Sequence, residues 1–471
     1  MTEPSDEPAL SVPSRGSLAA RALGLTRWLV LALALFATLR LALPALGTFP
    51  RTLTAEESDT FLGGHRLVDL LTTRPDDPRL PKPGLSTRLK VGFETTATNP
   101  RLRGLEDKPP RRAALEAPVP RYLAALGLGL LPASPNATNL ERVQTASALA
   151  MTVAVLVLLY GFRHRSRLFR IVLALAILTM PGALDAALSG GYGASATLVM
   201  ALFLVTLERL VTTGRGSLTL AVLLGLALGI HPFAVALTAP IFIAWALRPG
   251  PAPSSASSPA PSPGLLSLPS APVLLYLVPV IALIVLVLLW PALWNETGKR
   301  LGAWLLDLGS TRSVPQAVLD LSFDQTASRA PQAFTALLQW LGWTPLPVLG
   351  LWLVGFAGAV REGRRALWSP ILIVATLLFA GALDGGLFGA RLSLLPLLWV
   401  PTALTAADGA ARAALAIERR LAADTRPRRV ATQAPMVRAA LFGTVLLIAP
   451  VLQAARGTTL GLARQTGSEA R

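Results

Sequence analysis

Apolar residues in this chain are grouped into long runs separated by short polar segments. A helix needs about 20 apolar residues to cross the roughly 30 Å hydrocarbon core of a membrane. Runs near that length recur throughout the chain, and they predict an all-α polytopic membrane protein with about 11 transmembrane helices. The predicted spans are 27–48, 143–162, 168–187, 194–211, 217–230, 232–247, 272–292, 344–360, 367–384, 391–407 and 438–455.

The adjacent runs 217–230 and 232–247 are each short for a span and are separated by His231 and Pro232. Proline removes a backbone donor and clashes with the preceding turn, so the helix is expected to break or kink there. The pattern is compatible with two spans joined as a hairpin or with one broken, tilted element.

Composition agrees with a membrane protein and changes how the charge is interpreted. Hydrophobic residues make up 52% of the chain and charged residues 15%, which excludes a disordered chain or a coiled coil as the main body. The net charge is +17, a value that would suggest a nucleic-acid partner in a soluble protein. Here most basic residues of the short loops fall on one side of the predicted spans, so no nucleic-acid partner is expected.

The same arginine bias predicts the orientation, with the N-terminus cytoplasmic and the C-terminus outside. The composition is rich in Ala, Leu and Arg, which favours a bacterial inner membrane with a periplasmic outer face. The 27–455 region is the predicted transmembrane domain. The other predicted segments are a cytoplasmic N-terminal tail 1–26, a long periplasmic loop 49–142, a flexible Pro/Ser-rich cytoplasmic linker 249–271, a second periplasmic loop 293–343 and a periplasmic tail 456–471.

Acidic residues gather directly after the first predicted span. Glu56, Glu57 and Asp59 precede residues 61–71, in which Phe61 and the leucines and valine at 67, 68 and 71 have helical spacing. Such a helix would lie on the membrane and hold the acids at its surface, where a carboxylate can act as a base toward a hydroxyl. The alternative is a solvated helix start in which Thr54 and Glu57 form a capping box.

Basic residues on the predicted outer side are candidates for binding a lipid phosphate, because the guanidinium fork matches phosphate oxygens. These candidates are Arg391, Lys299, Arg300, Arg121 and Arg142. Simpler roles are also open: Arg142 can snorkel at the membrane interface, and Arg391 can pair with Asp384. Glu116 and His231 are possible substrate contacts, although His231 can equally belong to a capped turn.

Cysteine is absent and only three histidines are present, so a disulfide framework, a thiolate site and a multi-histidine metal centre are not expected. The acids at 56, 57 and 59 offer oxygen ligands that suit a divalent cation. We nevertheless predict that no metal or other cofactor is required.

In their order along the chain, several short motifs resemble the GT-C superfamily of membrane glycosyltransferases, of the protein O-mannosyltransferase and aminoarabinose-transferase type. Glu56-Glu57 stands where the family has Asp-Glu, and segment 116–123 stands where it has His-Pro-Pro-Leu. The resemblance covers about residues 27–455. Further similar segments are Arg142-Val143, Gly225 to Pro232 with His231 in place of a lysine, Trp290-Pro291-Ala292-Leu293-Trp294, and Arg391 with Leu395-Pro396.

The resemblance implies a GT-C-like fold and transfer, with inversion, of a sugar from a polyprenyl-phosphate donor on the outer face. The acceptor would be a hydroxyl or amine of a lipid, glycan or protein. Glu56 would be the base, Glu57 would orient the acceptor, and Asp59 would be a further substrate contact. Two departures, Glu for Asp at 56 and the missing histidine before Pro118, keep a non-catalytic GT-C-like partner in envelope glycan assembly as an alternative. A lipid-linked-sugar flippase is another, although charged residues inside the predicted spans are scarce.

Overall fold

The computed structural model is helical wherever it describes the chain, and it contains no strand in those residues. This confirms the all-α prediction for the described part. The described residues are 26, 28–39, 60–61, 63–65, 67–68, 118–131, 139–180, 182–183, 186–187, 192–246, 272–294, 297–298, 301, 329–362, 365–383 and 394–424. The predicted linker 249–271, the predicted span 438–455 and the tail 456–471 lie outside them.

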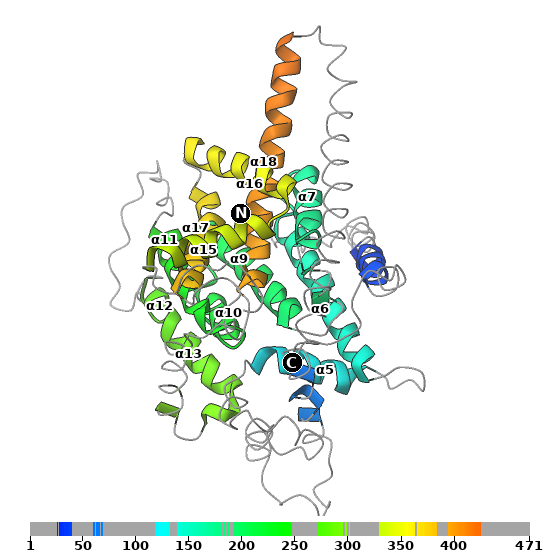
Figure 1. The fold of residues 1–471 in the computed structure, drawn as a ribbon, viewed down its shortest axis with the longest axis vertical. Coiled ribbons are helices and arrows are strands. Elements are labelled where there is room, and N and C mark those ends of the chain that lie inside the picture. Colours follow the sequence, from blue (N-terminus) through cyan, green and yellow to red (C-terminus); the bar gives the residue numbers. More distant parts are fainter. Residues whose placement is uncertain are drawn as a thin grey trace, which may run out of the picture.

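The helices form one bundle, drawn in Figure 1 with α18 rising from its upper end and α5 crossing its lower end. Helical residues 28–37, 60–61, 63–65 and 67–68 come before the labelled elements. The labelled elements are α5 (Pro118–Leu130), α6 (Asn139–Gly161), α7 (Arg167–Leu178), α9 (Tyr192–Thr213), α10 (Ser217–Leu228), η5 (Pro232–Leu237), α11 (Thr238–Ala246), α12 (Pro272–Tyr276), α13 (Val278–Leu289), η6 (Pro291–Leu293), α15 (Arg329–Trp343), α16 (Leu346–Glu362), α17 (Arg365–Leu383) and α18 (Leu395–Asp424).

Two described helices, α6 and α9, are long and apolar enough to cross a membrane. A third candidate is the pair Thr335–Trp343 and Leu346–Arg361, which is bent by 115° at its break. The described residues therefore suggest a membrane protein with two or three candidate spans, and they do not confirm the predicted count. Shorter apolar helices lie at several other predicted spans, including Ser217–Leu228, Pro232–Ala246 and Val278–Leu289.

Proline and glycine explain why some predicted spans appear as shorter helices. The predicted span 168–187 contains α7, which ends at Leu178. Pro181 and Gly182 follow, and Gly182 has φ +81°, a left-handed conformation that side-chain-bearing residues rarely adopt. The break expected at His231 and Pro232 is present, because α10 ends at Leu228 and a 3-10 helix begins at Pro232.

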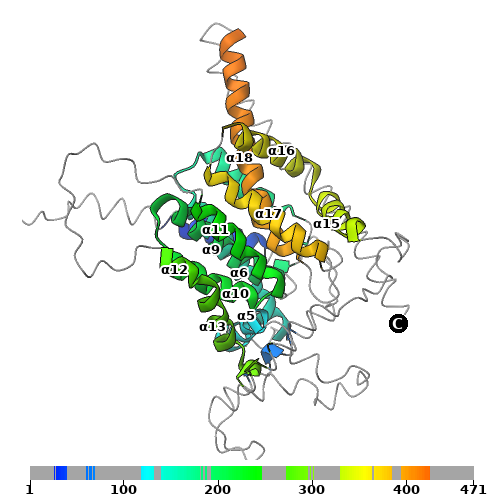
Figure 2. The same cartoon turned by 90° about the vertical axis from the view of Figure 1, so that its left-hand side faces the viewer.

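Helix α18 is central to the packing, and it contacts α16, α7, α17 and α9. It continues past the predicted end of its span at residue 407 to Asp424, so its last turns project beyond the other helices (Figure 2). Gly355 of α16 and Gly409 of α18 allow the two backbones to touch, because a Cβ on either would overlap a carbonyl of the partner helix. Trp340 adds a polar contact, since its Nε1 donates to Thr402 Oγ1 over 3.2 Å.

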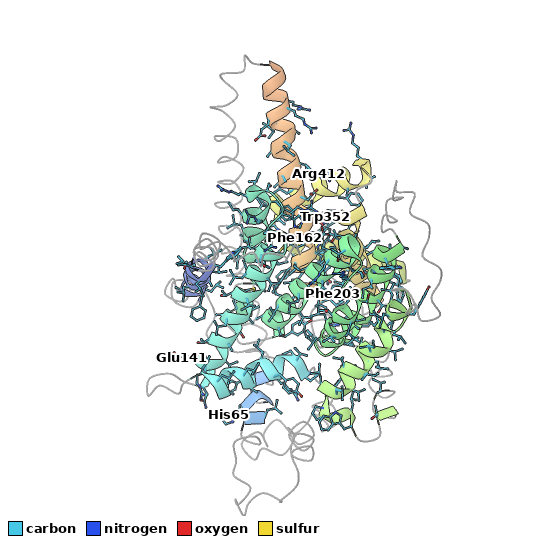
Figure 3. All side chains as sticks on the ribbon, turned by 180° about the vertical axis from the view of Figure 1, so that it is seen from behind. His65, Glu141, Phe162, Phe203, Trp352 and Arg412 are labelled. Atoms are coloured by element: carbon cyan, nitrogen blue, oxygen red, sulfur yellow. The ribbon has the colours of Figure 1, made fainter. Side chains whose placement is uncertain are left out.

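The two ends of the bundle carry different predicted loops. Figure 3 labels His65 and Glu141 at the lower end, and Phe162 and Arg412 at the upper end. His65 belongs to the predicted outer side, whereas Phe162 adjoins a predicted inner turn and Arg412 lies in a predicted inner segment. These labelled residues lie apart in the bundle, and the orientation in a membrane stays a prediction.

Candidate functional site at the lower end of the bundle

Three of the predicted site residues, Arg121, Arg142 and His231, are described by the structure. Their geometry can be examined directly. The other predicted site residues lie outside the described part of the chain, and their roles stay predictions. They are Glu56, Glu57, Asp59, Glu116, Lys299, Arg300 and Arg391.

Helix α5 forms the base on which the site is built. Pro118 and Pro120 lie in its first turn, where the missing N–H groups cost little because a helix start leaves its donors unpaired. The buried face of α5 includes Arg121, Ala124 and Leu128, which are spaced by three and four residues. Its outward face exposes leucines, and Leu130 is 77% exposed.

The helix at residues 60–68 packs on α5. A Cβ added at Gly63 would lie 2.7 Å from Cδ of Arg121, so only glycine allows this approach without a shift. A Cβ added at Gly64 would likewise lie 2.5 Å from Cβ of Ala124. Phe61 and Val68 pack with the cluster around Ala124. The apolar face that the spacing assigned to the membrane surface therefore meets α5.

Leu67 connects the same helix to the end of α13. It is 2% exposed and packs in one cluster with Leu286, Trp290 and Leu293. Tyr122 of α5 and Leu301 border this cluster. Three parts of the chain that are far apart in sequence therefore meet here: the helix at 60–68, α5, and the segment that leads from α13 into the second predicted outer loop.

Arg121 is buried, with 2% of its surface exposed. Burying a charged guanidinium is costly unless nearby polar groups compensate it, so its place under Gly63 is a specific feature of this end of the bundle. The residue lies one helical position before Tyr122, and both belong to the same turn of α5. Arg121 thus places a cation at the meeting point of the three segments.

Tyr122 fastens α5 to α13. Its hydroxyl donates to the carbonyl oxygen of Leu289, the last residue of α13, over 2.7 Å. That carbonyl lies in the last turn of α13, where a helix has no further backbone N–H groups to pair its carbonyls. Pro291, which has no N–H, follows shortly after. Trp294 satisfies a second carbonyl of the same turn, because its Nε1 donates to Val287 over 2.8 Å. Burial raises the pKa of Tyr122 to about 12, so the hydroxyl stays protonated and can donate.

Sequence reasoning did not single out Tyr122. The available signal was weak: a tyrosine beside a candidate arginine, and a proline just after a long apolar run. The pairing joins positions 167 residues apart, and no local pattern specifies such a distance.

His231 caps the start of η5. Its Nδ1 accepts a hydrogen bond from the backbone N–H of Phe233 over 3.2 Å, and the residue is 2% exposed. An accepting Nδ1 places the proton of the neutral ring on Nε2. The turn lies beside α5, because Val119 N–H donates to Gly229 O over 3.1 Å. The capped-turn interpretation is therefore realised, and a substrate contact for His231 stays a prediction.

Arg142 caps the carbonyl end of α5. Its Nε and Nη2 donate to Leu131 O over 3.0 and 2.7 Å, and Nη2 also donates to Leu128 O. Nη1 reaches Asn139 Oδ1 over 3.2 Å. A cation at a helix C-terminus also complements the helix dipole. The guanidinium thus holds α5 against the start of α6, and a phosphate contact for it stays a prediction.

No group of three metal-ligating side chains occurs in the described ranges. No protein-family model matches the chain, and no characterised protein matches it in a sequence search. The resemblance to GT-C enzymes therefore stays an expectation drawn from the sequence motifs.

Proposed function

We propose that this protein is a membrane glycosyltransferase of the GT-C type that uses a polyprenyl-phosphate sugar. It would transfer the sugar to a hydroxyl or amine of a lipid, glycan or protein acceptor. The finer features of the proposal are about 11 spans, an inner bacterial membrane and an active face on the periplasmic side.

One observation supports the proposal: described residues that adjoin the predicted acids and two of the predicted cations in sequence meet Arg121 and α5 at the lower end of the bundle. Glu56 is four residues from Thr60, so covalent geometry keeps their Cα atoms within about 14 Å. Thr60 is the first described residue of the helical segment that approaches Arg121 through Gly63. Lys299 and Arg300 lie between Gly298 and Leu301, and Leu301 packs beside the Leu67 cluster.

The chemistry of transfer suits this set of residues. The lone pair of the acceptor would form a bond to the anomeric carbon on the side opposite the phosphate. The bond from that carbon to the phosphate oxygen would break, and its electron pair would leave with the polyprenyl phosphate. Glu56 would take the proton of the acceptor, and Glu57 would orient the acceptor. Cations would stabilise the negative charge that develops on the leaving phosphate, which is usually a large part of catalysis.

Arg121 is the described residue best placed for that last role. Its burial lowers the local dielectric, so its attraction for a phosphate is stronger than that of an exposed arginine. Lys299, Arg300 and Arg391 are the further cations of the proposal. Arg142 is a further cation near this end, and its guanidinium engages α5 carbonyls.

The test uses sealed membrane vesicles that contain the full chain and a radiolabelled polyprenyl-phosphate sugar. Label that moves to an acceptor supports a transferase. Label that crosses the bilayer unchanged would identify a flippase, and label that does neither would favour a non-catalytic partner. Glu56→Gln should abolish transfer with insertion intact, because the amide cannot accept the proton. Glu418→Gln, in the projecting part of α18, is the matched control and should leave transfer unchanged.

A further inference from the structure

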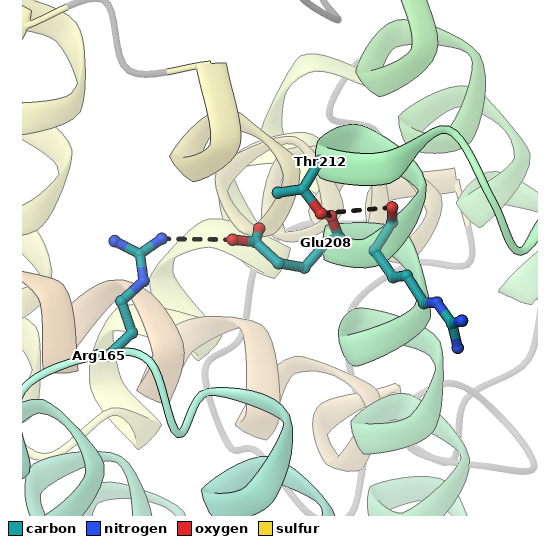
Figure 4. A network of polar contacts seen from close by, with 4 residues as sticks. Arg165, Glu208 and Thr212 are labelled. Carbon is teal, nitrogen blue, oxygen red and sulfur yellow. Dashed lines mark hydrogen bonds and ion pairs between the residues drawn. The ribbon is translucent and has the colours of Figure 1, made fainter. Parts of the chain in front are cut away.

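The upper end of α6 carries an arginine-rich turn that the proposed function does not use. Five basic residues, Arg163, His164, Arg165, Arg167 and Arg170, follow the end of α6 within eight positions. Glu208 of α9 pairs with Arg165 over 3.3 Å (Figure 4). In the described part of the chain, no acid pairs with the other three arginines.

These arginines lie at an unusual place for positive charge. Arg167 and Arg170 occupy the first turn of α7, which contains no acid. The start of a helix is the positive end of its dipole and normally attracts acids. The Nε of Arg170 is buried without a hydrogen-bond partner. The local field is therefore strongly positive, and among the residues that the structure describes Glu208 is the one acid paired with this turn.

Aromatic side chains connect this charge to the apolar surface of the bundle. The guanidinium of Arg163 lies 4.6 Å above the ring of Tyr160, and Trp28 meets that ring edge-on at 6.1 Å. Tyr160 is 54% exposed. Tyrosine and tryptophan prefer the boundary between hydrocarbon and water, so this pair marks the level of the lipid headgroups.

An apolar stripe descends along α6 from Tyr160. Leu149 and Val153 are 40% and 44% exposed, and their helical spacing places them on the same face as Tyr160. Eleven residues separate Leu149 from Tyr160, which corresponds to about 16 Å along the helix. One leaflet contributes roughly half of the 30 Å hydrocarbon core, so the stripe matches the depth of a single acyl layer.

We propose that this surface binds an anionic phospholipid. The acyl chain would lie along Leu149 and Val153, and the headgroup phosphate would contact Arg163 with Arg167 and Arg170 nearby. Charge complementarity and the continuous apolar stripe favour a lipid over a soluble anion, because a soluble anion has no acyl chain to cover the stripe. The predicted orientation makes this the cytoplasmic leaflet, the leaflet whose anionic lipids attract basic segments beside a membrane. The site is independent of the proposed transferase activity.

The experiment compares lipid binding to the full chain in an uncharged detergent by native mass spectrometry. Phosphatidylglycerol and phosphatidylcholine with identical acyl chains are titrated, and inorganic phosphate is added as a competitor. The expected result is at least ten-fold tighter binding of phosphatidylglycerol, which weakens when salt is raised. Equal binding of the two lipids would overturn the proposal, and so would full displacement by millimolar phosphate.

Matched variants locate the site. The triple variant R163Q/R167Q/R170Q should lose the preference by about ten-fold or more, because each basic residue near a charged surface contributes roughly five-fold. The control R419Q/R420Q removes two exposed arginines from the projecting part of α18 and should keep the preference. A preference lost equally in both would show a general charge effect and refute the site. If the triple variant does not fold, the lipid and salt comparison on the unaltered chain still decides.

Discussion

The hydrogen bond from Tyr122 to Leu289 provides a sharp test of how the lower end is held together. Tyr122→Phe keeps the ring and removes the donor, so the Leu289 carbonyl loses its partner at a helix end. A buried carbonyl without a partner costs about 1–3 kcal/mol. Hydrogen bonds measured inside a membrane protein average nearer 0.6 kcal/mol, so about 1 kcal/mol is the working value here.

A loss of about 1 kcal/mol corresponds to roughly five-fold more frequent local opening. Amide hydrogen exchange, followed peptide by peptide, should therefore rise about five-fold in α5 and in the last turn of α13. Helices α6 and α9 should keep their exchange rates. Tyr276→Phe is the matched control, because Tyr276 is 70% exposed. Unchanged exchange at both helix ends in Tyr122→Phe would refute the tether.

The pKa of Tyr122 adds a second arm to the same test. Its value is raised from 10.0 to about 12 by burial, so the folded state holds the proton more tightly than the unfolded state. The contribution of the neutral hydroxyl is complete below pH 10 and is lost as pH rises from 10 through 12. The protein should therefore lose stability over that window more steeply than Tyr122→Phe does. Parallel curves for the two proteins would contradict the assignment.

Two further predictions concern the same end of the molecule. Arg142→Gln should remove the donors from the α5 carbonyls and destabilise α5 by about 1–2 kcal/mol. Faster amide exchange in α5 would reveal this loss. If transfer activity were lost while α5 exchange stayed unchanged, Arg142 would instead belong to phosphate binding. Gly63→Val should push the helix at 60–68 away from Arg121 and abolish sugar transfer with insertion intact, measured by the vesicle assay. Gly350→Val in α16, where an added Cβ also meets nothing within 4 Å, is its control. Normal transfer in Gly63→Val would show that this contact is not needed for activity.

Much of the helical content follows from local patterns. The predicted span 194–211 lies inside α9, and the predicted span 143–162 nearly coincides with α6. These segments succeed because apolar periodicity and terminal residues act over a few turns. The predicted span 168–187 appears as the shorter helix α7, because Pro181 and the left-handed Gly182 interrupt the helix within the apolar run.

The roles of the site residues were less predictable. Arg142 was expected at an interface. Its donation to the carbonyls of Leu128 and Leu131 and to the side-chain amide oxygen of Asn139 depends on how α5 meets α6. The apolar face of the helix at 60–68 was expected to meet lipid and instead meets protein. A periodic pattern shows that a face is apolar, but it does not say whether protein or lipid covers it.

The sequence by itself determined a helical chain with membrane-spanning character and the helix break at His231 and Pro232. Those features depend on apolar length, on proline and on glycine, which act locally. Only the tertiary structure decided that Arg121, Gly63 and the end of α13 meet, and that Tyr122 bonds a carbonyl 167 residues away. Such contacts arise from how whole helices pack, and a helix end with unpaired carbonyls can take its donor from any segment that packing brings near.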